Sequence, residues 1–398
     1  MKVYSPTLFV EINSSDFIFA VGDKNTNNQF NLIYKSLEPI QGIENYQITN
    51  FDLVLSIIKK NIYSIEQKVN FIFKDMVLII NNFNCSFINL TGFKKLNGSQ
   101  ILKENITYIL NSLKSNIDET ENKKTILHIF NSNYNLDKKK IENLPIGLFG
   151  DFYSHELSFC LINNNDYKNL NNIFNKCNLK IKKFLVKSFI EGSDISNENE
   201  NLDTFYQIKI NKNNSQIFYF ENDSLKFEQN FDFGSDLVLR DIAKVTSLKI
   251  DVVKFFLNKI ELHEDISKDE VIEKELFNNE NYVRIKKKLI FEIAKARIQE
   301  FSEKFINKNI NLKSYDKKDS VIFIKFDDQS HYLSFKHIYK LSFSLNNNVT
   351  IKFLKNVTIE KLIFNVDKII NYGWRKEAVP VTHAKKSIIA KFFDALFG

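Results

Sequence analysis

The sequence predicts a mixed α/β protein in which one lobe plan occurs twice. Stretches with helical spacing alternate with stretches typical of strands, which is the order expected of an α/β chain. A pair of strands joined by a polar turn opens each half: Leu8–Ile12 with Phe17–Val21, and Phe205–Ile210 with Gln216–Phe220. Such pairs are typical of hairpins. Because 398 residues exceed what one core usually serves, we expect an internal duplication into two lobes.

Apolar spacing predicts the other elements of the first half. Helices are expected at Phe51–Ile65, Ser99–Leu113 and Tyr167–Asn178, and strands at Met76–Ile80, Thr125–Phe130 and Leu157–Ile162. Ser99 is a suitable N-cap for the second helix because a serine hydroxyl can accept a free amide of the first turn.

The second half begins after a polar, acidic stretch, Ser193–Asp203, which is typical of a loop between lobes. Helices are then expected at Asp236–Thr246, Lys249–Lys259, Tyr282–Phe305, Ser334–Ser342 and Ile359–Tyr372, and a strand at Val321–Phe326. Thr358 and Gly373 are suitable cap residues for the last helix.

The composition excludes several classes of protein. With 43% apolar and 26% charged residues the chain is of globular type, and no run approaches the roughly 18 uncharged apolar residues of a membrane-spanning helix. The first residues carry no secretory signal, so we expect a cytoplasmic location. The net charge of +7 allows attraction to anionic lipid without requiring it, and we expect no nucleic-acid partner.

Common catalytic and metal-binding motifs do not occur in the sequence. The 10 glycines form no G-x-G, G-K-[ST] or G-x-S-x-G pattern, which excludes the usual phosphate fingerprints and the nucleophile elbow. Cys85, Cys160 and Cys177 form no C-x-x-C pair, and the 6 histidines are scattered. We therefore expect no metal site and no catalytic residue, and an ordinary metabolic enzyme is disfavoured.

The C-terminal residues predict a short tether followed by an amphipathic helix. Periodicity stops over residues 376–383, which contain Pro380, and resumes over 384–398. The apolar face of this helix consists of Ile388, Ile389, Phe392, Phe393, Leu396 and Phe397. Lys385 and Lys386 in its first turn suit an anionic membrane surface better than they suit the helix dipole.

This helix is a candidate membrane anchor, and the alternative is a terminal helix docked on its own domain. Partial insertion of its large apolar side chains, at roughly 1 kcal/mol each, gives about 6 kcal/mol, which is close to one myristoyl chain. A monomer anchored in this way would bind reversibly. Stable attachment therefore predicts self-association into a filament or oligomer.

Local stretches of sequence add a resemblance to a known family. They are Pro145-Ile146-Gly147-Leu148-Phe149-Gly150 after the strand at 126–129, Cys177-Asn178-Leu179 within 169–185, the helix start at 233–243, and the helix stretch 293–300. In their order and spacing they resemble the FtsA family of bacterial cell-division proteins. That resemblance implies a duplicated actin-like fold with two lobes, an inserted small α+β subdomain in the first lobe, and the C-terminal amphipathic helix on its tether.

The resemblance also implies a division of the chain into subdomains. The first lobe core would be 1–76 and 164–199, the inserted subdomain 77–163, the second lobe core 200–238 and 319–375, the helical, partner-binding subdomain 239–318, the tether 376–383, and the membrane-targeting helix 384–398.

The family's three nucleotide loops fall on residues 11–16, 209–216 and about 324–326. All three have lost their glycines, the first has also lost its lysine, and the second has also lost both of its acids. Side chains would therefore intrude where amides should cradle phosphate, and a plausible Mg²⁺-water ligand is lost. ATP with Mg²⁺ stays a candidate only through the resemblance, and hydrolysis is not expected. The degenerate candidates for nucleotide contact are Glu11, Asn13, Ser14, Asn213, Ser215 and Gly234. Lys209 or Lys212 could contact phosphate, and the alternative is that both are surface lysines.

By resemblance the protein would be a membrane-tethered adaptor that self-assembles and anchors the ring of the tubulin-like protein FtsZ at the cytoplasmic face of the inner membrane, at the division site. The C-terminal peptide of FtsZ would dock near Arg297 and Glu300, and other division proteins would also bind. The alternative for these two residues is an i, i+3 surface ion pair.

Two other functions stay open at this stage. One is a scaffold of pilus assembly resembling the actin-like protein PilM, which lacks such a terminal helix. The other is an ATPase or sugar-kinase-like enzyme of the same superfold, since fold does not fix function.

Overall fold

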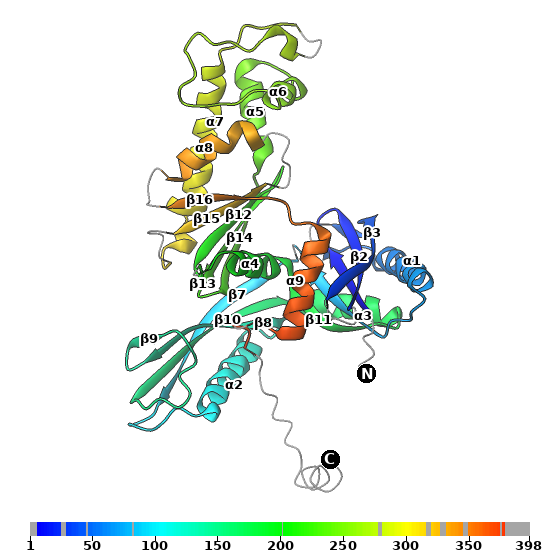
Figure 1. Ribbon diagram of the computed structural model, residues 1–398, viewed down its shortest axis with the longest axis vertical. Helices are drawn as coiled ribbons and strands as arrows, with labels where there is room; N and C mark the ends of the chain where they lie inside the picture. Colours follow the sequence, from blue (N-terminus) through cyan, green and yellow to red (C-terminus); the bar gives the residue numbers. More distant parts are fainter. Residues whose placement is uncertain are drawn as a thin grey trace. The chain divides into compact units, whose positions relative to one another are not determined.

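The computed structural model describes residues 6–24, 29–44, 47–81, 83–200, 202–277, 281–315, 320–326, 332–344, 349–374 and 376–378 (Figure 1). The chain forms two compact units. The first comprises residues 1–185 and 368–398, and the second comprises residues 186–367. Both contain strands and helices, which confirms the mixed α/β class.

The first unit contains a five-stranded sheet with the order β11-β6-β1-β2-β3. Its strands are β1 (Thr7–Ile12), β2 (Asp16–Lys24), β3 (Phe30–Pro39), β6 (Asp75–Ile80) and β11 (Lys180–Val186). β1, β2 and β3 form an antiparallel meander, and β6 lies parallel to β1. Short strands β4 (Ile43–Glu44) and β5 (Gln47–Ile48) pair with each other before α1.

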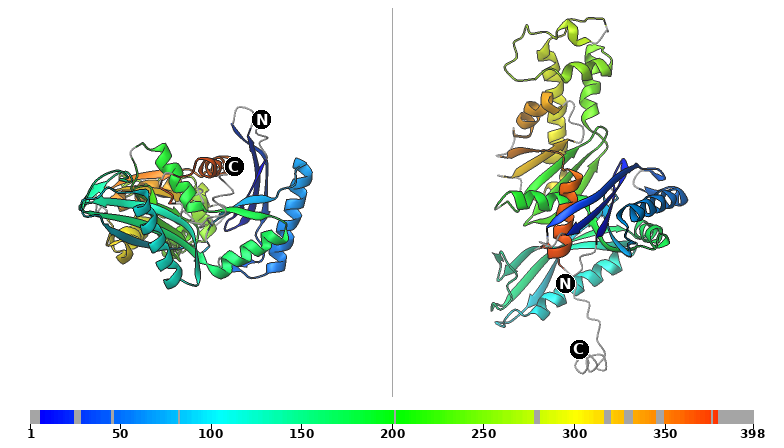
Figure 2. Two further views of the ribbon diagram at one scale, coloured as in Figure 1. Left: turned by 90° about the horizontal axis from the view of Figure 1, so that it is seen from below. Right: turned by 45° about the vertical axis from the view of Figure 1, so that its right-hand side comes forward.

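Helices α1 (Phe51–Val69) and α3 (Asn164–Lys176) lie side by side against this sheet (Figure 2). α1 begins where the sequence indicates, because Oδ1 of Asn50 accepts the amide of Leu53 at 3.0 Å. Val54, Ile58, Ile62 and Ile65 form its buried face, at the spacing from which the helix was expected.

A second sheet of the first unit has the order β7-β10-β8-β9 and lies against α2 (Lys103–Thr120) (Figure 1). Its strands are β7 (Ser86–Lys95), β8 (Lys124–Leu136), β9 (Lys139–Ile141) and β10 (Phe152–Asn163). They are antiparallel, and α2 buries Ile109, Leu110, Leu113 and Ile117. The role of this region as an inserted subdomain stays a prediction.

The expected start of α2 at Ser99 is wrong, since the helix begins at Lys103. The preceding residues pair instead with the loop before β10: the amide of Ile101 donates to Leu148 O at 2.8 Å, and that of Gly98 donates to Gly150 O at 3.1 Å. Asn105 Oδ1 then accepts the amide of Leu102 at 2.8 Å. Extended pairing therefore outweighs the capping tendency of serine here.

The second unit contains a five-stranded sheet with the order β14-β13-β12-β15-β16. Its strands are β12 (Phe205–Ile210), β13 (Ser215–Glu221), β14 (Ser224–Phe231), β15 (Val321–Phe326) and β16 (Thr350–Leu354). β12, β13 and β14 form an antiparallel meander, and β15 lies parallel to β12. Like β1 in the first unit, the central strand β12 has an antiparallel neighbour on one side and a parallel neighbour on the other. The two five-stranded sheets therefore share one plan.

One face of this sheet packs on a helical layer made by α5 (Ser235–Thr246), α6 (Ile250–Leu257), the 3-10 turn η1 (Lys274–Phe277), α7 (Lys287–Ser302) and α8 (Tyr332–Ser344). Tyr206, Ile208 and Ile210 of β12 point into that core. α7 is shorter than the expected helix over 282–305, because residues 285–286 are extended: Ile272 N donates to Ile285 O at 2.8 Å. A π-helical turn, η2 (Glu303–Asn307), follows α7, and a 3-10 turn, η3 (Ile310–Leu312), comes next.

Helix α4 spans Lys187–Glu198, so residues 193–198 are helical, whereas a loop was expected over residues 193–203. The serines of this stretch satisfy their hydroxyls within the helix: Ser193 Oγ donates to Ile190 O at 2.8 Å, and Ser196 Oγ donates to Gly192 O at 3.3 Å. The compact units divide at residues 185 and 186, so α4 lies with the second unit, whereas the expected core of the first lobe extended to residue 199.

The last helix, α9 (Ile359–Tyr372), has the predicted bounds and caps. Oγ1 of Thr358 accepts the amide of Lys361 at 3.3 Å, and Gly373 has φ +72 at the position after the helix. Eight of the described strands were not expected: β3, β4, β5, β7, β9, β11, β14 and β16. β3 alternates half-buried and exposed residues, and such strands are hard to separate from loops in a sequence rich in Asn and Lys.

No helix in the described part of the chain is both long enough and apolar enough to span a bilayer.

Candidate functional site

The turn between β1 and β2 contains Asn13 and Ser14, two of the expected nucleotide contacts. Oδ1 of Asn13 accepts the amides of Ser15 and Asp16, each at 2.7 Å, and the hydroxyl of Ser15 at 3.2 Å. The amide of Asn13 itself donates to Asp16 O at 3.1 Å. The turn therefore uses these amides internally, while Ser14 lies exposed at the tip. Glu11, the third expected contact, is 1% exposed in β1.

The turn between β12 and β13 is closed by two asparagines. The amide of Asn211 donates to Asn214 O at 2.9 Å, and Asn211 Nδ2 donates to Asn214 Oδ1 at 2.5 Å. Asn213 lies exposed between them. Ser215 is fully buried, and its hydroxyl donates to Phe233 O at 2.8 Å. The structure therefore brings Ser215 close to the start of α5, while Asn213 points to solvent.

Gly234 lets the start of α5 approach this turn. A Cβ at Gly234 would lie 2.1 Å from Asn211 O, so the contact requires glycine. The first amides of the helix use that contact: Ser235 N donates to Asn211 O at 2.9 Å, and Asp236 N donates to Lys212 O at 3.0 Å. These are the amides that a helix N-terminus would offer to an anion. Here they bind the protein's own carbonyl groups.

A buried ion cluster lies on the face of the second unit's sheet that carries Lys209. Lys209 Nζ lies 2.7 Å from Glu191 Oε2, and Lys325 Nζ lies 3.1 Å from Glu191 Oε1. The side chains of Lys209, Glu191 and Lys325 are only 7%, 3% and 9% exposed. The interpretation of Lys209 as a surface lysine is therefore wrong, because a partner on α4 neutralises it in the interior. We call these three residues the Glu191 triad.

Electrostatics keep Glu191 ionised. Burial alone would raise its pKa, but the charges of Lys209, Lys325 and Lys187 outweigh burial and hold the pKa of Glu191 well below its usual range. Burial lowers the pKa of Lys209, and Glu191 counteracts that effect. On β14, two strands away in the sheet, burial raises the pKa of the partly buried Glu228 to about 7, and the charge of Lys209 opposes the shift.

The described residues do not fit ATP with Mg²⁺. Phosphate needs backbone amides that are free to donate, and Mg²⁺ needs carboxylate or water ligands. The amides named above at both turns donate within the protein, and a lysine occupies the second-loop position at which the family pattern has an acid. Lys325, at the adenosine-side position, is bound to the same carboxylate as Lys209.

The expected partner-binding residues lie together on the surface of the second unit. Arg297 Nε lies 2.5 Å from Asp241 Oδ2, and Arg297 also pairs with Glu300. Lys304 Nζ lies 2.7 Å from Glu300 Oε1 and, chiefly through this hydrogen bond, lowers the pKa of Glu300. Arg297 and Glu300 are 25% and 38% exposed. They are accessible, and their role in binding a partner stays a prediction.

The first residues of the expected tether are bound to the second sheet of the first unit. Asn131 N donates to Lys376 O at 2.6 Å, and Ala378 N donates to Ile129 O at 2.7 Å, so residues 376–378 add a short antiparallel bridge to β8. Residues 379–383 and the helix residues Lys385, Lys386, Ile388, Ile389, Phe392, Phe393, Leu396 and Phe397 lie outside the described residues.

Glu377 holds this bridge through its side chain. Its carboxylate lies 3.4 Å from His128 Nδ1 and 2.8 Å from Lys183 Nζ. Burial would raise the pKa of Glu377, but the hydrogen bonds from His128 and Lys183 and the charge of Lys183 lower it to about 2. Residues 376–378 are therefore fixed to the second sheet of the first unit.

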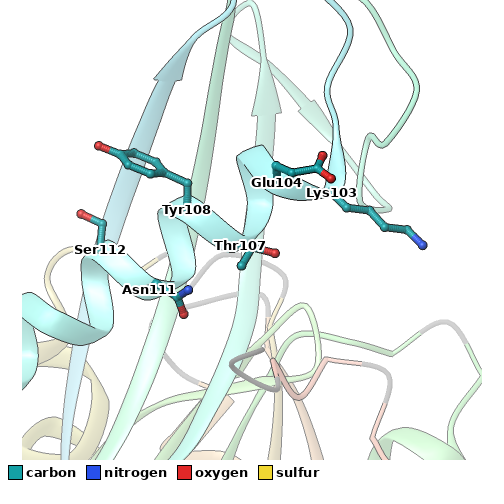
Figure 3. A pocket seen from close by; sticks show the side chains of 6 residues that line it. All are labelled: Lys103, Glu104, Thr107, Tyr108, Asn111 and Ser112. Atoms are coloured by element: carbon teal, nitrogen blue, oxygen red, sulfur yellow. The ribbon is translucent and has the colours of Figure 1, made fainter. Parts of the chain in front are cut away.

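A shallow hollow of about 440 Å³ lies along α2, lined by Lys103, Glu104, Thr107, Tyr108, Asn111 and Ser112 (Figure 3). All six side chains come from one helix face, so the hollow is an open surface. Within the described ranges, no group of three His, Cys, Asp or Glu side chains is placed to hold a metal ion.

Glu191, Glu377 and His128 were missed by the sequence analysis. Glu191 follows the apolar pair Phe189-Ile190 and precedes Gly192, and a single acid in such a run is the one signal that was present. Glu377 lies in the stretch interpreted as a tether, and its partners are more than 190 positions away in the chain.

Comparison with curated proteins confirms the sequence resemblance. The chain is 22% identical over 234 residues to the cell division protein FtsA of Buchnera aphidicola subsp. Schizaphis graminum. The matched region covers 59% of this chain and 56% of that protein. The chain is also 21% identical over 242 residues to FtsA of Buchnera aphidicola subsp. Acyrthosiphon pisum, covering 61% and 57%. The chain thus spans less than two thirds of the curated relatives it matches. No family model matches the chain.

Comparison with solved structures supports the fold. The protein of the PilM-PilN type IV pilus biogenesis complex superposes with a TM-score of 0.52 at 8% identity, over 93% of this chain and 97% of that one. At this identity the likeness concerns the fold alone. The chain therefore has the mixed α/β fold of actin-like ATPases, in which two sheets follow one plan.

Proposed function

We propose that this protein is a membrane-tethered, actin-like adaptor of cell division that anchors the FtsZ ring to the cytoplasmic face of the inner membrane at the division site. The observation that carries the proposal is the sequence similarity to FtsA, which extends over about 60% of the chain. The fold is compatible with it, and the other division proteins that it would contact are left to experiment.

The membrane tether rests on the sequence of the C-terminal segment. Ile388, Phe392 and Leu396 represent the apolar face of residues 384–398, and Lys385 and Lys386 supply charge for anionic lipid. Because Ala378 is bound to β8, five residues, 379–383, would join the first unit to the helix. At roughly 3.3 Å per extended residue, this segment keeps the unit within about 20 Å of the bilayer surface. Self-association would then make weak anchors act together.

The FtsZ peptide would bind at the surface of α7. Arg297 is held by Asp241 and Glu300, so its guanidinium is oriented while a quarter of it stays exposed. A carboxylate of the peptide could take one of its remaining donors. Arg297→Glu is expected to abolish peptide binding, with a change in folding stability below about 1 kcal/mol. Fluorescence anisotropy of a labelled FtsZ C-terminal peptide measures this.

The matched control for that variant is Arg240→Glu, an exposed charge reversal on α5 in the same unit. It should leave the affinity unchanged. If Arg297→Glu bound the FtsZ peptide with the affinity of wild type, Arg297 would not contact the peptide, and its role would be limited to the surface ion pair.

The adaptor would work without hydrolysing ATP. At the first turn the amides of Ser15 and Asp16 donate to Asn13, and at the second the amides of residues 235 and 236 donate to carbonyl groups of the turn, so these amides are not offered to phosphate. Lys209 replaces the acid of the second loop. Binding and assembly then depend on protein and lipid contacts. We therefore expect no ATP turnover by the purified protein.

Co-sedimentation with anionic liposomes, with and without residues 384–398, tests the proposal. The full chain should pellet with the liposomes and bring FtsZ with it, and the truncated chain should stay in the supernatant. Pelleting without FtsZ would retain the membrane tether and reject the division role. A full chain that stays soluble and does not bind FtsZ would favour a PilM-like scaffold instead.

A further inference from the structure

Two buried lysines of the second unit lie where the family resemblance places nucleotide loops. Lys209 and Lys325 are register partners on the parallel strands β12 and β15, and each is the second-last residue of its strand. Their ammonium groups each bind a different oxygen of Glu191, at 2.7 and 3.1 Å. Two separate loop sequences thus contribute one lysine each to one carboxylate on α4.

Helix α4 is held against the sheet so closely that Glu191 can reach both lysines. A Cβ at Gly192 would lie 2.0 Å from the ring of Phe220, and this ring is 1% exposed and stacked on Phe205 at 4.7 Å. The ring has no room to move, so a side chain at position 192 is excluded. The glycine next to Glu191 therefore sets the distance between the carboxylate and the strands.

We infer that the Glu191 triad is a built-in substitute for a bound nucleotide: it links the two loop strands to α4, so that the second unit is folded and stable without ATP and does not bind it. The charges that link strands β12 and β15 to α4 therefore belong to the protein and not to a bound nucleotide. This inference concerns the second unit alone and does not depend on the membrane or FtsZ partner proposed above.

The energetics of buried ion clusters give the expected size of the effect. Removing one member of such a cluster leaves an uncompensated buried charge, whereas replacing all members by apolar residues of similar volume is often close to neutral. For a unit of this size, loss of Glu191 corresponds to a fall in Tm of roughly 6–20 °C. A ligand present at 100 times its Kd would raise Tm by roughly 5–10 °C.

The test measures Tm by scanning calorimetry on the full chain, with and without millimolar MgATP, and titrates MgATP calorimetrically. The wild-type Tm should change by less than about 1 °C with MgATP, because a ligand that does not bind the native state cannot stabilise it. Glu191→Gln should lower Tm by roughly 6–20 °C. The triple variant Glu191→Met, Lys209→Met, Lys325→Met should recover most of that loss.

Glu198→Gln is the matched control, since Glu198 lies on the same helix, is 57% exposed and pairs with Lys361. It should leave Tm within about 1–2 °C of wild type. If Glu191→Gln does not fold, Lys325→Met serves in its place. This variant keeps the ion pair between Lys209 and Glu191, so its Tm should fall by less. A rise of several degrees for wild type in MgATP, a wild-type Tm in Glu191→Gln, or a triple variant no more stable than Glu191→Gln would each overturn the inference.

Discussion

The two five-stranded sheets place opposite charges at equivalent positions of their central strands. β1 and β12 have six residues each, and the second-last residue is Glu11 in one and Lys209 in the other. Both strands are followed by a polar turn whose first residue is an asparagine, Asn13 or Asn211. The turn after β1 is closed by the side chain of Asn13, whereas the turn after β12 is closed by Asn211, Asn214 and the start of α5.

This difference shows two ways in which one strand plan can close the turn after its central strand. In the first unit, a single carboxamide takes the amides of the turn. In the second, the turn's carbonyl groups take the amides of a helix, and an ion triad fixes the strand behind it. The first solution is local in sequence and the second joins distant segments, so mutations should have larger effects in the second unit.

The largest expected effect is that of Lys209→Ala. It removes the closest cation from the buried Glu191 and leaves it with Lys325 at 3.1 Å and the carboxamide of Gln207 at 3.4 Å. We expect a loss of about 3–5 kcal/mol in the free energy of unfolding. Hydrogen exchange of β12 and β13 measures the loss in the second unit. Lys212→Ala, at an exposed position of the same turn, is the control and should cost less than about 0.5 kcal/mol. Equal exchange rates in the two variants would contradict the role of the triad.

The next effect concerns pH and the first unit. The folded pKa of Glu377 is about 2 against an ordinary value of 4.5, so the native state binds fewer protons between these values. Its stabilising contribution is complete above pH 4.5 and is lost as pH falls toward 2. Glu377→Gln should therefore be less stable than wild type at neutral pH, by about 2–3 kcal/mol, and the difference should shrink in acid.

Fluorescence of Trp374 measures this effect, because the protein's single tryptophan is buried beside residues 376–378. Glu121→Gln, which alters a surface pair with Lys124 in the same unit, is the control. A difference between Glu377→Gln and wild type that stays constant from pH 7 to 2.5 would show that the carboxylate does not hold the bridge.

The second unit should show the opposite sign at Glu228. Its folded pKa is about 7 against 4.5 unfolded, so the native state keeps a proton that the unfolded chain has lost. This group makes stability fall as pH rises from 4.5 to 7. Glu228→Gln should match wild type below pH 4.5 and exceed it above pH 7, by about 2 kcal/mol once partial exposure is allowed for.

Urea unfolding followed by circular dichroism at pH 4 and pH 8 measures the Glu228 effect. The exposed Glu275→Gln in the same unit serves as the control. A Glu228→Gln variant with the same stability as wild type at pH 8 would argue against a desolvated carboxyl at this position.

The smallest effect is expected at the first turn. Asn13→Ala removes the acceptor of the Ser15 and Asp16 amides, which water can then solvate because the turn is exposed, so the loss should be about 1 kcal/mol. Ser14→Ala at the exposed tip should be neutral. Trp374 fluorescence in urea measures both. A loss for Asn13→Ala as large as that for Lys209→Ala would remove the distinction between a local and a long-range closure.

Much of the fold follows from local pattern. Thr358 and Gly373 predict both ends of α9, and the paired strands around residues 13–15 and 211–214 predict the two hairpins. In each case the residues that determine the element lie within it or next to it. The helical end of α4 was missed because its serines bond to their own backbone, which composition does not reveal.

The candidate site could be predicted only in part. The absence of glycines from the expected loops predicted a poor phosphate cradle. In the structure, several amides of these turns donate to the protein's own oxygens. The partner of Lys209 lies 18 positions earlier on α4 and that of Lys325 lies 134 positions earlier, so no local pattern relates them. Buried polar pairs depend on tertiary packing, and a single sequence gives little information about which distant residues pack together.

The most direct test of the account is FtsZ recruitment to anionic liposomes by the full chain, measured by co-sedimentation with and without MgATP at equal protein concentrations. An adaptor whose loops are closed by its own side chains should bring the same fraction of FtsZ into the pellet in both conditions. Recruitment that requires MgATP, or that fails in both conditions while the chain itself binds the liposomes, would contradict the account.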